Sequence, residues 1–138
     1  MWLPKDERKL LSLYYNEIGK PSTNKLIDEN DLIKTILPKW HTQHVHNSND
    51  YKMWLEGKSK VATANKALSE RKLITHREAG DSIEISLDVE GYDLGRKYDN
   101  WFDRSGLWFA EYKNHWIWLI ASFFGGVLGG LLINLLSR

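Results

Sequence analysis

Cysteine is absent from the 138-residue sequence, which excludes disulfide bonds and thiolate metal sites. This absence fits a reducing compartment. We also expect no secretory signal peptide, because a charged residue occurs within the first five positions and no apolar core of the required length follows. We therefore expect the N-terminal part of the chain to stay in the cytoplasm.

An excess of charge of one sign is missing too, since 19 basic residues are balanced by 18 acidic ones. No global field therefore indicates nucleic acid or an acidic membrane as the partner. The balance is uneven along the chain: residues 52–77 carry a net charge of +5, and residues 78–103 carry a net charge of −6. This layout is typical of a solvated surface, or of two faces with different partners.

Motifs of catalysis are also absent. The sequence has no nucleophile elbow and no phosphate-cradling glycine loop, and helix capping explains the acidic group Asp28, Glu29 and Asp31. We therefore expect the protein not to be an enzyme and to have no cofactor.

One long uncharged run is present at residues 116–136, WIWLIASFFGGVLGGLLINLL. A helix of this length measures about 31 Å, which matches a bilayer core of roughly 30 Å. Aromatic residues at its start suit the headgroup zone. The run predicts a single C-terminal transmembrane helix at 116–136, a juxtamembrane segment at 105–115 and a soluble domain at 1–104. The domain is expected on the cytoplasmic side of the inner membrane.

Small residues are concentrated inside this run. They are Ser122, Gly125, Gly126, Gly129 and Gly130. Small residues spaced by four clear one face of a helix, so that a second helix backbone can approach closely. The pattern predicts a homo-oligomer that packs through this helix, with ordinary glycine usage in membrane helices as the alternative.

The first 104 residues carry helical patterns followed by a strand pattern. Apolar spacing predicts helices at residues 4–18 and around residues 32–37, and a third helix from a Ser59 cap to about residue 72. Val61, Ala64 and Leu68 form the expected buried face of the third helix. The polar stretch 41–50 has no periodicity and is interpreted as a loop.

A hairpin and a last helix are expected next. Ile83, Ile85 and Leu87 alternate with polar residues after a turn at 78–81, which is the period of a half-buried strand. Asp88 is the expected cap of a final helix that continues toward the uncharged run, with a break at residues 105–106. The predicted fold class is α+β, mainly helical with a small β-hairpin.

The order helix, helix, helix, hairpin, helix is that of a winged helix-turn-helix. Residues 64–98, ANKALSERKLITHREAGDSIEISLDVEGYDLGRKY, also resemble the third helix, wing and following helix of MarR- and PadR-like winged helices. The matching positions are Leu68, Leu73 and Ile74 where the wing opens, and Ile85, Leu87 and Gly91 where it closes. Asp88 replaces the usual capping threonine. Because winged helices also serve as plain protein-interaction modules, the resemblance does not fix a function.

The resemblance implies that the third helix enters a DNA major groove. The residues implied to contact DNA are Lys58, Lys60, Thr63, Asn65 and Lys66 on this helix, and Arg77 near the wing tip. Lysines suit phosphates, whereas Thr63 and Asn65 suit base edges. Glu78, Asp81 and Glu84 oppose this interpretation, because acidic side chains on the wing repel phosphate.

A histidine cluster lies in the expected loop. His41, His44 and His46 follow a His-x-x-His-x-His spacing, and imidazoles so close together can share a zinc or nickel ion. The sequence offers no cysteine and no certain fourth ligand, so three solvated histidines are the favoured interpretation and no metal is predicted.

Two functions follow as hypotheses. The first is a membrane-tethered winged-helix regulator that binds DNA. The second is a membrane-bound interaction or effector protein of prophage or defence type, whose winged helix docks a protein partner and whose glycine-rich helix self-associates. The lysines of the third helix favour the first hypothesis, and the acidic wing and the glycine pattern favour the second.

Overall fold

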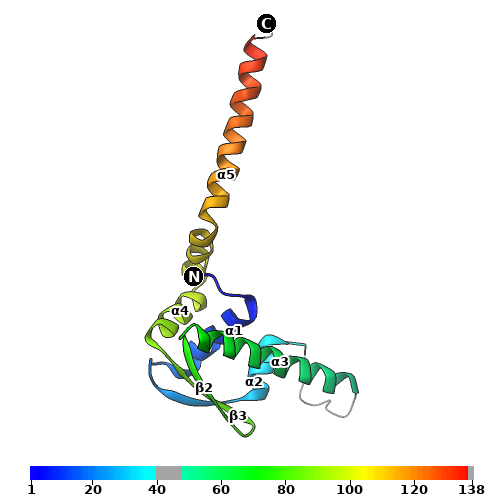
Figure 1. The fold of residues 1–138 in the computed structure, drawn as a ribbon, viewed down its shortest axis with the longest axis vertical. Helices are drawn as coiled ribbons and strands as arrows, with labels where there is room; N and C mark the ends of the chain where they lie inside the picture. Colours follow the sequence, from blue (N-terminus) through cyan, green and yellow to red (C-terminus); the bar gives the residue numbers. More distant parts are fainter. Residues whose placement is uncertain (40–47, 137–138) are drawn as a thin grey trace. The chain divides into compact units, whose positions relative to one another are not determined.

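The computed structural model describes residues 1–39 and 48–136, except for the side chains at 48, 101, 102, 116 and 126–136. The chain divides into two compact units, Leu3–Arg104 and a second one made of Met1–Trp2 with Ser105–Arg138. The elements in chain order are α1 (Lys5–Ile18), β1 (Asn24–Asp28), α2 (Glu29–Ile36), α3 (Ser48–Glu70), β2 (Ile74–Ala79), β3 (Ser82–Leu87), α4 (Val89–Asp99) and α5 (Trp101–Leu136) (Figure 1). The α+β class predicted from the sequence is confirmed.

The sheet has three antiparallel strands in the order β1-β3-β2, one more than the predicted hairpin. Ile85 of the central strand pairs with Lys25 of β1 on one side and with His76 of β2 on the other. The predicted alternation along β3 is confirmed, because Ile83, Ile85 and Leu87 are all buried. The sequence analysis missed β1, which buries only one apolar side chain and so carries almost no period-two signal.

α1 lies at the centre of the unit Leu3–Arg104 and packs against α2, α3, α4 and β3. Pro4 is its N-cap, and the left-handed Gly19 ends it at φ 70°, with the Gly19 N–H donating to the Tyr15 carbonyl. The predicted helix at residues 4–18 is therefore confirmed to within one residue. The largest fully buried side chains of the core are those of Leu3, Leu10, Leu11, Tyr14, Leu32, Ile33, Val61, Leu68, Leu73, Ile74, Ile85 and Leu87.

α3 begins at Ser48, so the predicted start at Ser59 is wrong and Ser59 lies within the helix. The described residues 48–50, expected in a loop, belong to its first turn. The helix continues through Gly57, where it crosses α2 closely. A Cβ at this position would lie 2.5 Å from Cγ2 of Ile33, so only glycine fits without movement of Ile33.

α4 is held against the junction of α3 and β2. The Asp88 N–H donates to the Leu73 carbonyl oxygen at 3.1 Å, and a Cβ added to Gly91 would lie 1.8 Å from that oxygen. Gly91, one of the positions that carry the resemblance, is therefore required for this close backbone approach. Asp88 is the N-cap residue but its side chain makes no capping hydrogen bond, which corrects the capping role expected for it.

The last two helices meet at Asn100, where the backbone is extended (φ −83°, ψ 119°). The expected break at residues 105–106 is wrong, since α5 passes through both without interruption. Nothing around Gly106 demands a bend, because a Cβ there would meet open space.

The predicted membrane-spanning helix at residues 116–136 must be corrected. In the described part of the chain, no helix combines the length and the apolar character that crossing a bilayer requires. The first turns of α5 carry Asp103, Arg104, Glu111 and Lys113, and charged side chains are costly in a bilayer core.

Candidate nucleic-acid interface

The buried face of α3 is wider than the sequence analysis expected. Val61, Ala64 and Leu68 are buried as predicted, and Asn65 lies among them with no exposed surface. The Tyr14 hydroxyl donates a hydrogen bond of 2.6 Å to Oδ1 of Asn65. In the described part of the chain, Nδ2 of Asn65 has no hydrogen-bond partner. Asn65 therefore belongs to the core and is not available to read a base edge.

The opposite face of α3 is open and carries short side chains. Ser59, Ala62, Thr63 and Lys66 are exposed, with helical spacings of three or four between most of them. The Thr63 hydroxyl donates to the Ser59 carbonyl at 2.8 Å, which fixes its rotamer against the helix. Because the side chains of Ser59, Ala62 and Thr63 are short, a large partner molecule can approach the helix backbone closely at this face.

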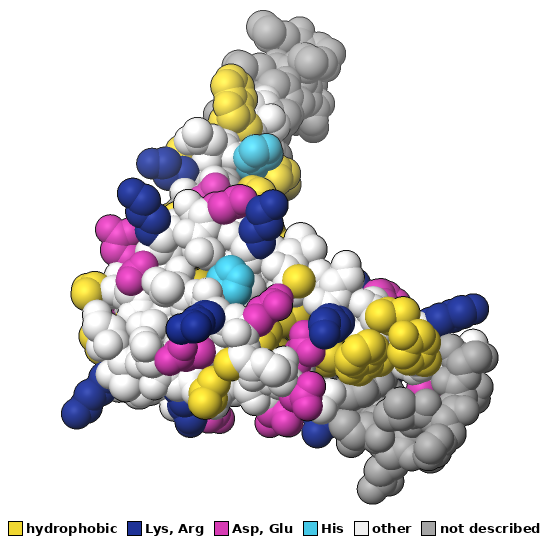
Figure 2. Space-filling view, turned by 60° about the horizontal axis from the view of Figure 1, so that its bottom comes forward, with side chains coloured by type: hydrophobic (Ala, Val, Ile, Leu, Met, Phe, Trp, Pro, Cys, Tyr) yellow, Lys and Arg dark blue, Asp and Glu magenta, His cyan; other side chains and the backbone are white. Residues whose placement is uncertain are grey.

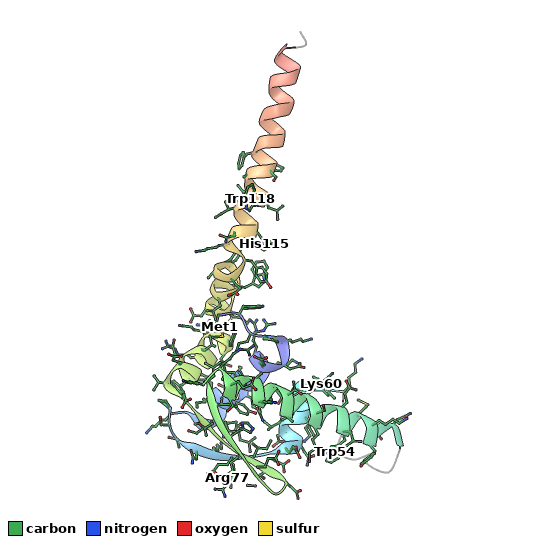
Figure 3. All side chains as sticks on the ribbon, in the orientation of Figure 1. Met1, Trp54, Lys60, Arg77, His115 and Trp118 are labelled. Atoms are coloured by element: carbon green, nitrogen blue, oxygen red, sulfur yellow. The ribbon has the colours of Figure 1, made fainter. Side chains whose placement is uncertain are left out.

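Two of the four candidate cations, Lys58 and Lys60 of α3, are already paired with acidic residues. Lys58 lies 3.2 Å from Glu29 of α2, and its ammonium sits 5.2 Å above the Trp54 ring. Lys60 lies 2.7 Å from Glu56, one turn earlier, and the hydrogen bond to Glu56 raises the pKa of Lys60. Lys60 and Trp54 project from different sides of α3 (Figure 3).

Lys66 and Arg77 are the other two candidate cations. Within residues 1–39 and 48–136, no ion pair involves Lys66, which is exposed near the end of α3. Arg77 is exposed on β2 and lies opposite Glu84 in the strand register (Figure 3). An acidic cross-strand neighbour reduces the positive potential that Arg77 presents. Lys66 is therefore the strongest of the candidates for a phosphate contact.

The β2–β3 hairpin does not project beyond the sheet. β1 pairs along β3 as far as Asp28 opposite Ser82, and the Glu29 N–H donates to the Asp81 carbonyl at the turn. The turn itself is short, with Gly80 at φ 67°. A hairpin tied down in this way positions its acidic residues, Asp81 included, close to the start of α2 rather than out toward a partner.

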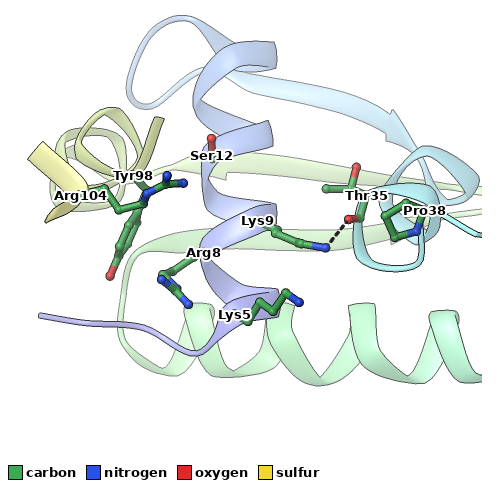
Figure 4. A pocket seen from close by; sticks show the side chains of 8 residues that line it. All are labelled: Lys5, Arg8, Lys9, Ser12, Thr35, Pro38, Tyr98 and Arg104. Atoms are coloured by element: carbon green, nitrogen blue, oxygen red, sulfur yellow. Dashed lines mark hydrogen bonds between the residues drawn. The ribbon is translucent and has the colours of Figure 1, made fainter. Parts of the chain in front are cut away.

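A second positively charged site was missed by the sequence analysis. A cavity of about 550 Å³ lies beside α1 (Figure 4). It is lined by Lys5, Arg8, Lys9, Ser12, Thr35, Pro38, Tyr98 and Arg104. The available signal was the polar stripe of the first helix, where Lys5, Arg8, Lys9 and Ser12 follow the spacing i, i+3, i+4, i+7.

The remaining candidate residues do not form a site in the described part of the chain. Ser122 and Gly125 are exposed on α5, and a Cβ at Gly125 would meet open space. The surroundings of Gly126, Gly129 and Gly130 lie outside the description, as do the residues of the histidine cluster, His41, His44 and His46. Among the described residues, no group of three histidine or acidic side chains is close enough to hold a metal ion.

The chain was compared with known proteins. No protein-family model matches it, and neither a curated protein nor a solved structure matches it. The functional argument therefore depends on the geometry of the chain itself.

Proposed function

We propose that the unit Leu3–Arg104 is a winged-helix domain that binds double-stranded DNA, with the open face of α3 in the major groove. The order α1-β1-α2-α3-β2-β3 with strands arranged β1-β3-β2 supports this proposal, because it is the arrangement in which a winged helix presents its third helix. The single observation that carries the DNA-binding part is the exposed strip Ser59, Ala62, Thr63 and Lys66.

The strip suits a duplex in two ways. Its short side chains let the helix approach base edges closely, and a threonine hydroxyl or methyl group can contact bases directly. Lys66, at the end of the strip, offers an ammonium to a backbone phosphate. The charge balance of the unit limits its affinity for DNA. Leu3–Arg104 contains 17 basic and 17 acidic residues, which are all the charged residues of the chain except Glu111, Lys113 and Arg138. We therefore expect binding that depends on a few local contacts and is strong only at low salt.

The test is fluorescence anisotropy of the full chain with labelled DNA duplexes at several salt concentrations. Lys66→Glu should weaken binding about tenfold and lower the log–log salt slope by about one. The matched control is Lys20→Glu, which makes the same change of charge in the turn between α1 and β1. Absence of binding at low salt, or equal loss in both variants, would reject the proposal.

A second candidate function is docking of a protein partner at the start of α3. Tyr51 and Leu55 are 51% and 44% exposed there, and the Tyr51 and Trp54 rings stack at 5.8 Å. Hydrophobic side chains gather at this end of α3, on the right of the view in Figure 2. Exposed aromatic groups of this kind are enriched in protein interfaces. If this function is correct and DNA binding is not, Tyr51→Ala will abolish a protein interaction that Lys66→Glu leaves intact.

A further inference from the structure

The cavity beside α1 gathers cations from two helices. Lys5, Arg8 and Lys9 come from one face of α1, and Arg104 comes from the first turn of α5, all within the unit Leu3–Arg104. None of the eight residues that line the cavity is acidic. Four cations around one solvent-filled space repel one another, so a bound anion would lower their mutual repulsion.

Lys9 is held in position by the end of α2. Its ammonium donates to the carbonyl oxygen of Thr35 at 3.2 Å (Figure 4) and to that of Ile36 at 3.4 Å. Carbonyls in the last turn of a helix lack intrahelical donors and carry partial negative charge, so they anchor an ammonium well. An ammonium has three donors, and two are used here, which leaves one for a ligand.

One acidic residue marks where an anion is disfavoured. Oδ1 of Asp99 accepts hydrogen bonds from the Ser12 hydroxyl at 3.1 Å and from the Asn16 amide at 2.8 Å. The negative charge of Asp99 therefore lies at the Ser12 end of the stripe on α1. An anion is favoured toward the other end, near Lys5, Arg8 and Lys9.

We propose that this cavity binds a small organic phosphate of about nucleotide size. Arginine and lysine side chains suit phosphate oxygens, arginine through paired N–H donors. A volume of about 550 Å³ exceeds what inorganic phosphate fills and lies within the usual range of small-molecule sites. Pro38 provides apolar surface for the rest of the ligand.

The experiment is calorimetric titration of the full chain with adenosine monophosphate, inorganic phosphate and adenosine. Adenosine monophosphate should bind most tightly, phosphate more weakly, and adenosine not measurably. Lys5→Ala and Arg104→Ala should each weaken adenosine monophosphate about tenfold, because each removes a charged hydrogen-bond donor. Both residues are exposed, so both variants are expected to fold, and circular dichroism of the unliganded proteins checks this.

Lys20→Ala is the matched control and should bind adenosine monophosphate like the wild type. Lys66→Glu should also keep this binding, which separates the cavity from the DNA proposal. Three results would overturn the inference: no heat with either phosphate compound, equal binding of adenosine and adenosine monophosphate, or equal loss in Lys20→Ala and Lys5→Ala. Displacement of adenosine monophosphate by a DNA duplex would also overturn it, since the cavity would then be a contact for duplex phosphates.

Discussion

The two faces of α3 differ in almost every physical respect. On one face, Val61 and Leu68 have no exposed surface and pack into the core of Leu3–Arg104. On the other face, Ser59, Thr63 and Lys66 are exposed, and among the described residues their side chains form no hydrogen bond or ion pair with another element. One face of α3 therefore forms part of the core, and the other face is available to a binding partner.

This difference separates stability from recognition. Substitutions on the buried face remove dispersion contacts and apolar burial, so they act on the free energy of unfolding. Substitutions on the open face remove no buried apolar contact and should change the free energy of unfolding by no more than about 0.5 kcal/mol. If α3 is a recognition helix, those same substitutions should change the affinity for DNA.

The largest expected effect is that of Leu68→Ala. The side chain of Leu68 is fully buried, so its truncation should lower the free energy of unfolding by about 3 kcal/mol. Thr63→Ala, five residues earlier on the open face, should change it by no more than about 0.5 kcal/mol. Urea denaturation followed by circular dichroism measures both. A similar loss in the two variants would show that the two faces are not distinct in energy.

An intermediate effect is expected for the polar pair in the buried face. Tyr14→Phe leaves Oδ1 of Asn65 buried without its donor, which should cost about 1–2 kcal/mol. Tyr14→Phe combined with Asn65→Leu should cost less than the two single losses added together, because no buried polar group is then left without a partner. Denaturation of the four proteins of this cycle measures the coupling. Strict additivity would contradict a direct interaction.

The same pair predicts a dependence on alkaline pH. Burial raises the pKa of Tyr14 in the folded protein, and the hydrogen bond to Asn65 only partly opposes this. Because this pKa is higher in the folded state than in the unfolded state, the folded state holds the Tyr14 proton more tightly. The stability that the neutral Tyr14 side chain contributes is therefore fully present below about pH 10, the ordinary tyrosine pKa. Stability should fall as the pH rises above that value. In Tyr14→Phe, the free energy of unfolding should no longer show the fall above about pH 10 that is due to Tyr14, and only the fall due to the other tyrosines should remain; urea denaturation at several pH values measures this.

The sequence predicted the fold where the apolar periodicity was strong. The spacing of Leu10, Leu11, Tyr14 and Ile18 predicted α1, and the alternation along β3 predicted the central strand. The start of α3 was not predicted, because residues 48–50 are polar and carry no apolar stripe, and because the glycine at 57 argues against a helix. That glycine is required by the close crossing of α2, a tertiary constraint that local sequence does not contain.

The candidate site was predicted only in part for a related reason. The resemblance implies a base contact for Asn65, although its position, one residue after Ala64 and three before Leu68, belongs to the buried stripe. The pairing of Lys58 with Glu29 joins residues far apart in sequence, and no pattern along the chain signals it. The cations of the cavity were visible as a stripe on α1, but Arg104 joins them only through the fold.

The smallest expected effect on stability, and the sharpest test of the open face, is that of Glu56→Gln. Glu56 is exposed and holds Lys60 at 2.7 Å in an ion pair one turn apart on the helix surface. Water and salt screen such an exposed pair, so the free energy of unfolding should barely change. The effect on the affinity for DNA should be larger and favourable. Lys60 no longer has to break an ion pair with Glu56 before it contacts a phosphate, and the helix loses a negative charge that repels DNA.

We expect Glu56→Gln to tighten DNA binding severalfold at low salt and to raise the log–log salt slope by up to about one. Glu90→Gln is the matched control, since it removes the same charge from the first turn of α4. Equal affinities in the wild type and Glu56→Gln would mean that Lys60 does not reach phosphate, leaving Lys66 to carry the contact from α3. A gain in Glu90→Gln as large as in Glu56→Gln would instead mean that only the net charge of the unit matters, and the open face of α3 would lose its assigned role.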